Sequence, residues 1–311
     1  MLTYSKLFRL PNLLITALAM VLVRYCLIRP VFQEGGIALQ LPLYLFVLLV
    51  LSVLFIAAAG YAINDYFDIR IDRLNKPKKI VLGRKVPIRK AILYHSLFNV
   101  IGVALGFYIA IQVGNFKLGF IHAFASLWLW GYSSRFKRTP LWGNVIIAFS
   151  AALTIFIVWL FEYFAMVKNV QFIPPIYLSE IFRLTLTMTV FAFVINLIRE
   201  IIKDIEDVPG DKRYGCRTLP VAIGINNTRL VALILTLLLM IGVAFIQYYL
   251  FSVVGKLIFY YFFIIHFLLV YLIIILVKAS QKEDYSFASQ LARVVIIAGI
   301  LAMQIYYISL P

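Results

Sequence analysis

The sequence predicts an all-α polytopic membrane protein with nine transmembrane helices. Of the 311 residues 64% are hydrophobic, a larger share than ordinary soluble domains have. Each of nine apolar runs approaches or exceeds the roughly 20 residues that a helix needs to cross the hydrocarbon layer of a bilayer. In chain order they cover residues 12–29, 42–65, 88–112, 118–134, 143–166, 182–203, 227–249, 255–278 and 287–309. We therefore interpret residues 1–311 as a single membrane-embedded domain.

The segments between these runs differ between the two sides of the predicted membrane. On one side they are short and carry little chemistry: 30–41, 112–117, 168–183 and 251–256. On the other side they are longer and richer in charge: 66–87, 135–142 and 204–227. Function is therefore expected on the second side.

Basic residues share this asymmetry. The chain has 29 Lys and Arg against 13 Asp and Glu, a net charge of +16 that could suggest nucleic acid binding. However, 23 of the 29 fall on the side that holds the N-terminus and the long loops. The other six are Arg24, Arg29, Lys117, Lys168, Arg183 and Lys256. This bias is typical of cytoplasmic loops, and we expect no nucleic acid partner. It predicts a multi-pass protein of the cell membrane, with these loops and the N-terminus cytoplasmic and the C-terminus outside.

The acidic residues gather in two places. Two runs share the pattern D-x-x-D-x-x-x-D, and each lies where an apolar run meets a basic loop. Together they hold eight of the 13 acids: Asp65, Asp68, Asp72, Glu200, Asp204, Glu206, Asp207 and Asp211. Carboxylate oxygens suit Mg²⁺, and Mg²⁺ suits phosphate. The sequence therefore predicts Mg²⁺ as cofactor and a diphosphate as substrate.

The duplicated run also predicts an internal repeat. The two acidic runs end the second and the sixth apolar run, so both have the same orientation, as in a parallel repeat. The repeat units would be about 12–134 and 143–278, with 287–309 as a ninth helix.

The first acidic run forms one face of a helix. Asn64, Asp68 and Asp72 are spaced four residues apart, and Asp65 joins this face three residues before Asp68. We expect all four to be metal ligands. The alternative is a solvated helix end whose acids pair with neighbouring arginines, Arg70 and Arg73. Ionisable residues within membrane segments are usually functional, which favours the metal site.

The second run follows the same helical spacing. Its stripe consists of Asn196, Glu200, Asp204, Asp207 and Asp211. Proline interrupts helices, so Pro209 and Gly210 are expected to end the helix and to place Asp211 on a turn. Glu206 points away from the stripe and is expected to be solvated. The predicted metal ligands here are Asp204, Asp207 and Asp211.

Basic residues follow both runs. A leaving diphosphate needs metals and Lys or Arg to stabilise the charge that develops on it. The expected substrate contacts are Asn64, Lys76, Arg84, Lys137, Lys212 and Arg217. The acids expected to be catalytic are Asp68, Asp72, Asp207 and Asp211.

Several motifs resemble those of the UbiA-type intramembrane prenyltransferases. Asn64-Asp-x-x-Asp68-x-x-x-Asp72 followed by Arg73-Leu-Asn-Lys-Pro77 is similar to the first signature of this family. Asp207-x-x-x-Asp211 with Gly215-Cys-Arg-Thr218 is similar to the second. Tyr132-Ser133 with Lys137, then Leu141-Trp-Gly-Asn144, resembles the segment between the fourth and fifth helices. The segment from Lys76 to Arg84 departs from the family pattern, which more often has Arg-Pro and a small-residue turn there.

The resemblance covers nearly the whole chain and has clear implications. It implies nine helices around a central cavity open to membrane lipids, a cytoplasmic cap of motif loops, Mg²⁺, and prenyl transfer from a polyprenyl diphosphate. The run from Arg199 to Asp211 looks most similar to the digeranylgeranylglyceryl phosphate synthase branch. That branch implies geranylgeranyl diphosphate as donor and geranylgeranylglyceryl phosphate as acceptor.

Three other interpretations stay open at this point. Sister branches of the family prenylate aromatic acceptors such as 4-hydroxybenzoate or dihydroxynaphthoate. A cation-coupled transporter would also use intramembrane acids, but near the midplane and with broken helices. An intramembrane aspartyl protease would need one Asp from each run and would leave at least four unexplained.

Overall fold

The computed structural model describes residues 2–75, 80–169 and 174–310, and helices make up nearly all of this part of the chain. In lipid a helix satisfies its own backbone hydrogen bonds, which is why long apolar runs adopt it. The elements are α1 (Leu2–Leu7), α2 (Leu10–Leu22), η1 (Val23–Ile28), α3 (Arg29–Glu34), α4 (Leu43–Asn75), α5 (Ile88–Gln112), η2 (Phe116–Leu118), α6 (Gly119–Ser134), η3 (Phe136–Arg138), α7 (Trp142–Asn169), α8 (Pro175–Arg213), α9 (Leu219–Ile223), α10 (Ile225–Val253), α11 (Lys256–Lys278) and α12 (Lys282–Ser309).

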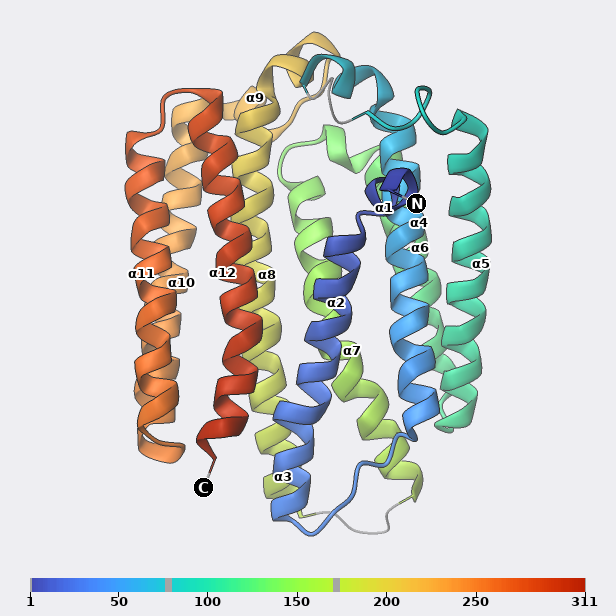
Figure 1. Ribbon diagram of the computed structural model, residues 1–311, viewed down its shortest axis with the longest axis vertical. Coiled ribbons are helices and arrows are strands. Elements are labelled where there is room, and N and C mark those ends of the chain that lie inside the picture. The colour runs from blue at the N-terminus through green and yellow to red at the C-terminus, as the bar shows by residue number, and fades with distance from the viewer. Residues whose placement is uncertain (1, 76–79, 170–173, 311) are drawn as a thin grey trace.

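The predicted class, an all-helical membrane protein, is confirmed. Within the described ranges, eight helices are long and apolar enough to cross a membrane, the first being the continuous segment Leu10–Glu34. The remaining predicted span, 118–134, corresponds to α6, which has 16 residues and is shorter than the others. It packs against α4 and α5 (Figure 1). The predicted count of nine is therefore approximate.

The ends of two helices differ from the prediction. The apolar runs predicted ends near residues 65 and 203, but α4 continues to Asn75 and α8 to Arg213. Both acidic motifs consequently lie on the last turns of long helices. The expectation that Asp211 sits on a turn was wrong, because α8 continues through Pro209.

The side chain of Asn75 binds α8 close to this proline. Proline lacks an N–H group and removes one backbone hydrogen bond from a helix. Asn75 Nδ2 donates to the carbonyl of Asp207 at 3.0 Å, and the N–H of Gly210 donates to Asn75 Oδ1 at 2.9 Å. One side chain from α4 therefore binds the backbone on both sides of Pro209.

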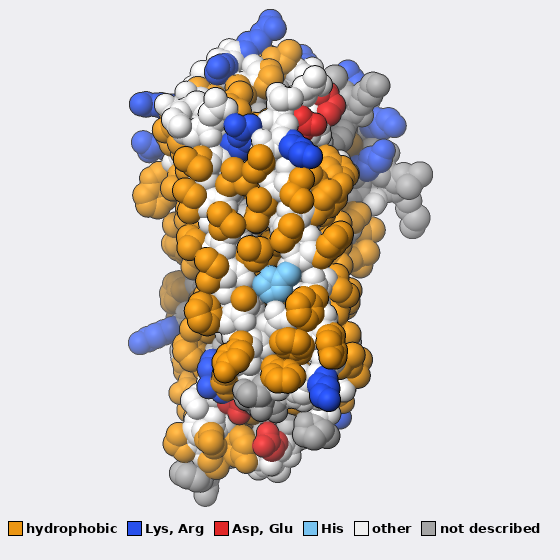
Figure 2. Space-filling view, turned by 90° about the vertical axis from the view of Figure 1, so that its left-hand side faces the viewer, with side chains coloured by type: hydrophobic (Ala, Val, Ile, Leu, Met, Phe, Trp, Pro, Cys, Tyr) orange, Lys and Arg blue, Asp and Glu red, His pale blue; other side chains and the backbone are white. Residues whose placement is uncertain are grey.

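The helices that matter for function form a ring. Neighbouring helices pack in the order α2, α4, α6, α7, α8 and α12, and α12 packs against α2 to close the ring. In Figure 1, α5 lies outside this ring on the right, and α10 and α11 lie outside it on the left. An apolar belt covers the middle of the face shown in Figure 2, with charged side chains gathered towards both ends. This distribution fits a protein embedded in a bilayer.

Candidate active site

A cavity of about 1220 Å³ lies inside the ring. Its walls come from all six ring helices, together with Ser5, Lys6 and Arg9 and the segment 80–85. Along α8 the wall extends from Met188 to Asp207, about 28 Å at the rise of an α-helix. Apolar side chains such as Ile155, Ile300 and Met303 line it alongside the acids of both motifs. The cavity can therefore hold a long apolar chain with a charged end.

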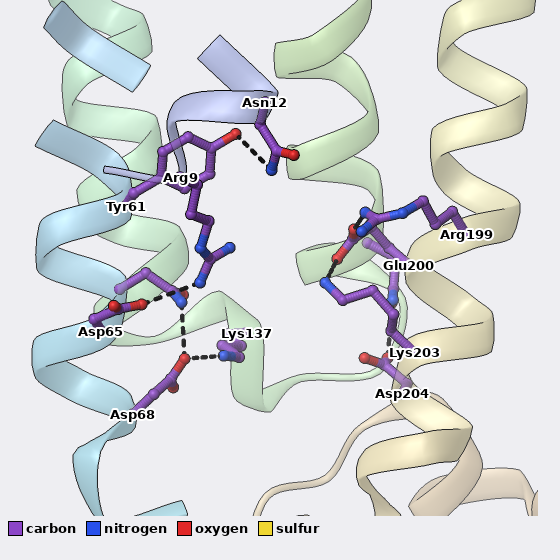
Figure 3. Close-up of polar contacts among 12 residues, drawn as sticks. Arg9, Asn12, Tyr61, Asp65, Asp68, Lys137, Arg199, Glu200, Lys203 and Asp204 are labelled. Carbon is purple, nitrogen blue, oxygen red and sulfur yellow. Dashed lines mark hydrogen bonds and ion pairs between the residues drawn. The ribbon is translucent and has the colours of Figure 1, made fainter. Parts of the chain in front are cut away.

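The α4 wall carries the first acidic motif. Asn64 Nδ2 donates to Asp68 Oδ2 at 2.8 Å, as expected for side chains one helical turn apart. Arg9 Nη2 donates to Asp65 Oδ1 at 3.1 Å, and Lys137 forms an ion pair with Asp68 (Figure 3). In the described part of the chain, Asp65 and Asp68 thus pair with these two cations rather than with Arg70 or Arg73, the pairing that the alternative interpretation required.

Lys137 stays protonated at this position. Burial alone would lower the pKa of its ammonium group, but the Asp68 carboxylate and the Tyr132 side chain outweigh burial, and the pKa is raised. Because Lys137 belongs to η3, which connects α6 and α7, it brings a fixed positive charge to the end of the cavity.

The α8 wall carries the second acidic motif, and the carboxylates there have a different mixture of charged and neutral partners. Glu200 accepts hydrogen bonds from Arg199 at 2.6 Å and from Lys203 at 2.8 Å. Asp204 Oδ2 instead accepts from the amide of Asn144 at 2.8 Å, and this amide is neutral. The hydrogen bond of Asp211 is likewise with a neutral group, the hydroxyl of Thr218, at 3.0 Å. This wall therefore favours an added cation.

The motif loops are joined to one another above the cavity. Besides the Asn75 bridge, the N–H of Arg217 donates to the carbonyl of Arg138 at 2.9 Å. The N–H of Cys216 donates to the carbonyl of Asp211 at 2.9 Å. These backbone contacts hold the segment after α8 against the segment after α6.

The residues of both motifs fit Mg²⁺. A second, smaller cavity of about 30 Å³ lies between the two motifs, lined by Asn75 and five aspartates: Asp68, Asp72, Asp204, Asp207 and Asp211. Nearby, Asn64 Oδ1 is a buried acceptor that lacks a hydrogen-bond partner among the described residues. No three acids in those residues are close enough to bind one ion by themselves. Mg²⁺ usually takes one or two carboxylates and completes its shell with phosphate oxygens and water, so this oxygen-rich set suits it.

The predicted substrate contacts fall into three groups. Asn64 and Lys137 line the large cavity. Arg84, Lys212 and Arg217 are exposed and line neither cavity, so their role stays a prediction. Lys76 lies outside the described residues.

The prediction for Glu206 was wrong, and six cations were missed. Glu206 is only 8% exposed and lines the large cavity rather than facing solvent. The cavity also contains cations that were not among the predicted substrate contacts: Lys6, Arg9, Lys85, Arg199, Lys203 and Arg293. The position of Arg199 and Lys203 within the second motif was a signal for two of them. Arg9 and Arg293 are brought in by α2 and α12 from distant parts of the chain.

Comparisons with known proteins agree with this geometry. The sequence model of the UbiA prenyltransferase family matches residues 35–300. A digeranylgeranylglyceryl phosphate synthase from Saccharolobus solfataricus is 33% identical over 186 residues, which cover 60% of this chain and 59% of that protein. The chain matches about three-fifths of the length of this and three other curated synthases of the same name.

Solved structures show the same fold. One, from a study of digeranylgeranylglyceryl phosphate synthase in membranes, superposes with a TM-score of 0.66 at 25% identity and covers 99% of this chain and 98% of its own. A UbiA homologue from Archaeoglobus fulgidus, bound to DMAPP and Mg²⁺, superposes with a TM-score of 0.54 at 20% identity. That match covers 97% of this chain and 99% of the homologue.

Proposed function

The chain belongs to the UbiA prenyltransferase family, and from this premise we propose that it is a Mg²⁺-dependent transferase that acts on a prenyl diphosphate within the membrane. The donor is geranylgeranyl diphosphate and the acceptor is geranylgeranylglyceryl phosphate. The names of the curated relatives support this pair of substrates. The single observation that carries the proposal is the meeting of both acidic motifs at one end of a long cavity.

The two parts of this cavity suit the two parts of a prenyl diphosphate. The apolar wall formed by side chains such as Ile155, Ile300 and Met303 accepts the isoprenoid tail. The acidic end, with Asp68, Asp72, Asp207 and Asp211, holds the diphosphate through Mg²⁺. Bound there, Mg²⁺ neutralises the phosphate oxygens and lowers the energy of the departing diphosphate.

The residues of this chain contribute to the reaction by binding, charge and exclusion of water. The bond between C1 of the prenyl group and the diphosphate oxygen breaks, and a bond between C1 and the acceptor hydroxyl oxygen forms. The products are an ether, diphosphate and one proton. Lys137 adds a fixed positive charge beside the diphosphate, and the helix ring keeps water away from the allylic carbon.

The proposed orientation follows from the charge bias. The motif loops and the N-terminus face the cytoplasm, and the C-terminus lies outside the cell membrane. Soluble or lipid-borne diphosphate would then reach the acidic end of the cavity from the cytoplasmic side.

The alternative functions explain the site less well. A transporter would bind its coupling ion near the midplane, whereas these acids lie on the last turns of α4 and α8. An aspartyl protease needs two acids, whereas five aspartates line the small cavity.

One experiment separates these functions. Purified protein is incubated with radiolabelled geranylgeranyl diphosphate, with Mg²⁺ or with EDTA, and the label that it retains is counted. We expect retention with Mg²⁺ alone, and loss of retention in Asp68→Asn. Glu283→Gln is the matched control, since Glu283 is exposed and lines neither cavity. Retention that is equal with and without Mg²⁺ would contradict the proposal.

A further inference from the structure

A group of basic side chains lines the cavity from the first aspartates of the two motifs inwards. It comes from three parts of the chain: the N-terminal end of α2, the middle of α8 and the middle of α12. We call these four residues the basic cluster: Arg9, Arg199, Lys203 and Arg293.

The basic cluster begins beside the acidic end, where Arg9 pairs with Asp65 and Lys203 precedes Asp204, and it extends away from that end. Arg199 precedes Asp207 by eight residues on α8, which places its backbone about 12 Å farther along the helix axis, away from the motif loops. Arg293 interacts electrostatically with Arg199, Arg9 and Glu200, so side chains from α2, α8 and α12 meet in this region. In Figure 3, Arg199 and Glu200 lie across the cavity from Asp65 and Asp68.

Two arginines of the basic cluster are not fully paired in the described part of the chain. Asp65 pairs with Arg9, and Glu200 pairs with both Arg199 and Lys203. Asp204 also interacts electrostatically with Lys203. Arg199 Nε is buried and has no hydrogen-bond partner among the residues described, and a buried donor of this kind is costly unless a ligand compensates it. Within the same residues no ion pair involves Arg293, which is exposed and lines the cavity.

Arg9 is held in place by its backbone and by an aromatic ring. Its φ of 50° lies in the left-handed region, which is uncommon for residues other than glycine. Its guanidinium lies 4.8 Å from the centre of the Tyr61 ring, a cation–π distance. Strained backbone of this kind is often found at ligand-binding positions. Arg9 is therefore fixed towards the cavity before any ligand binds.

We propose that the basic cluster binds the phosphate monoester of the acceptor, a site separate from that of the donor diphosphate. This inference rests on the proposed function. The acceptor carries its hydroxyl and its phosphate on one three-carbon glycerol unit, so the phosphate must bind near the reacting carbon. A phosphate monoester carries a charge of about −1.5 to −2 at neutral pH. Arginine matches phosphate with paired hydrogen bonds, and three of the four residues are arginines.

The test compares two acceptors that differ only in the phosphate. Transfer from geranylgeranyl diphosphate to geranylgeranylglyceryl phosphate, and to the dephosphorylated geranylgeranylglycerol, is measured for the wild type, Arg293→Gln and Arg199→Gln. We expect both variants to lower kcat/KM for the phosphorylated acceptor at least tenfold, mainly through KM. Transfer to the dephosphorylated alcohol and the KM of the donor should stay within about twofold of the wild type. Arg293→Lys should recover part of the loss, since it keeps the charge.

Arg89→Gln serves as the control for removal of charge. Arg89 is exposed at the start of α5 and lines neither cavity. An equal loss for both acceptors, or a rise in the donor KM, would overturn the inference and leave the proposed function intact. If instead the wild type forms no ether with either acceptor, the proposed function fails and the inference fails with it.

Discussion

Replacing Gly210 with alanine should separate the two aspartate motifs without removing a charged group. A Cβ atom at position 210 would lie 2.4 Å from Asn75 Nδ2, far inside van der Waals contact. Asn75 is only 7% exposed and forms two hydrogen bonds to this part of α8, so it cannot move without breaking them.

The two competing effects can be compared in size. Alanine has a higher helix propensity than glycine, which would stabilise α8 by up to about 1 kcal/mol. Displacing Asn75 leaves buried backbone groups of Asp207 and Gly210 without partners, at a cost of about 1–3 kcal/mol each. We therefore expect a net local cost of about 1–5 kcal/mol. If half of this free-energy cost also destabilises the transition state for prenyl transfer, kcat/KM falls by between about twofold and 100-fold.

A double-mutant cycle gives the sharpest assay. Asn75→Ala removes the same two hydrogen bonds and leaves space for a methyl group at position 210. The double variant should therefore lose no more geranylgeranyl transfer than Asn75→Ala alone. Thermal unfolding of each variant separates a local effect from loss of the fold. Additive losses in the double variant, or a fully active Gly210→Ala, would refute this account of the motif junction.

Three further predictions concern the site and the orientation of the chain. Asp68→Ala and Asp207→Ala should abolish turnover, since losing a metal ligand costs several kcal/mol of transition-state stabilisation. Both variants should still insert into the membrane and elute normally, and product formation close to that of the wild type would contradict the role of these two residues. Lys137→Gln should lower kcat/KM by about tenfold or more in the transfer assay, because it removes the positive charge beside Asp68, and an unchanged rate would exclude Lys137 from the charged end. For the orientation, the buried native Cys26 and Cys216 are first replaced by serine. A cysteine introduced at Lys212 should then react with an impermeant thiol reagent only from the cytoplasmic side, and one introduced at Leu310 only from outside. The opposite pattern would reverse the proposed orientation.

The sequence predicted the parts of the structure that local composition determines. The run 88–112 coincides with α5, because a long apolar segment bounded by polar loops leaves little choice in lipid. The helical spacing of Asn64, Asp68 and Asp72 was also informative, and Asn64 and Asp68 do form a hydrogen bond one turn apart. Local patterns were sufficient in both cases.

Local sequence patterns could not predict the contacts between segments that are distant in the chain. α8 continues through Pro209, and the side chain that binds its backbone there is Asn75, which is 135 residues away from Gly210 in the chain. Arg9 reaches Asp65 from the N-terminal segment, and Arg293 reaches the cavity from α12. Glu206 was assigned to solvent from its angle on an isolated helix, whereas the ring of helices encloses that side of α8 as well. Only the packing of the ring reveals these positions.

The central claim is transfer of a geranylgeranyl group to a phosphorylated glycerol ether. It is tested most directly by supplying the purified protein with Mg²⁺, labelled geranylgeranyl diphosphate, and either geranylgeranylglyceryl phosphate or 4-hydroxybenzoate, and by separating the lipid products. We expect a labelled diether phosphate with the first acceptor, little or no product with the second, and none of either when EDTA replaces Mg²⁺. Efficient prenylation of 4-hydroxybenzoate together with no diether phosphate would contradict the account.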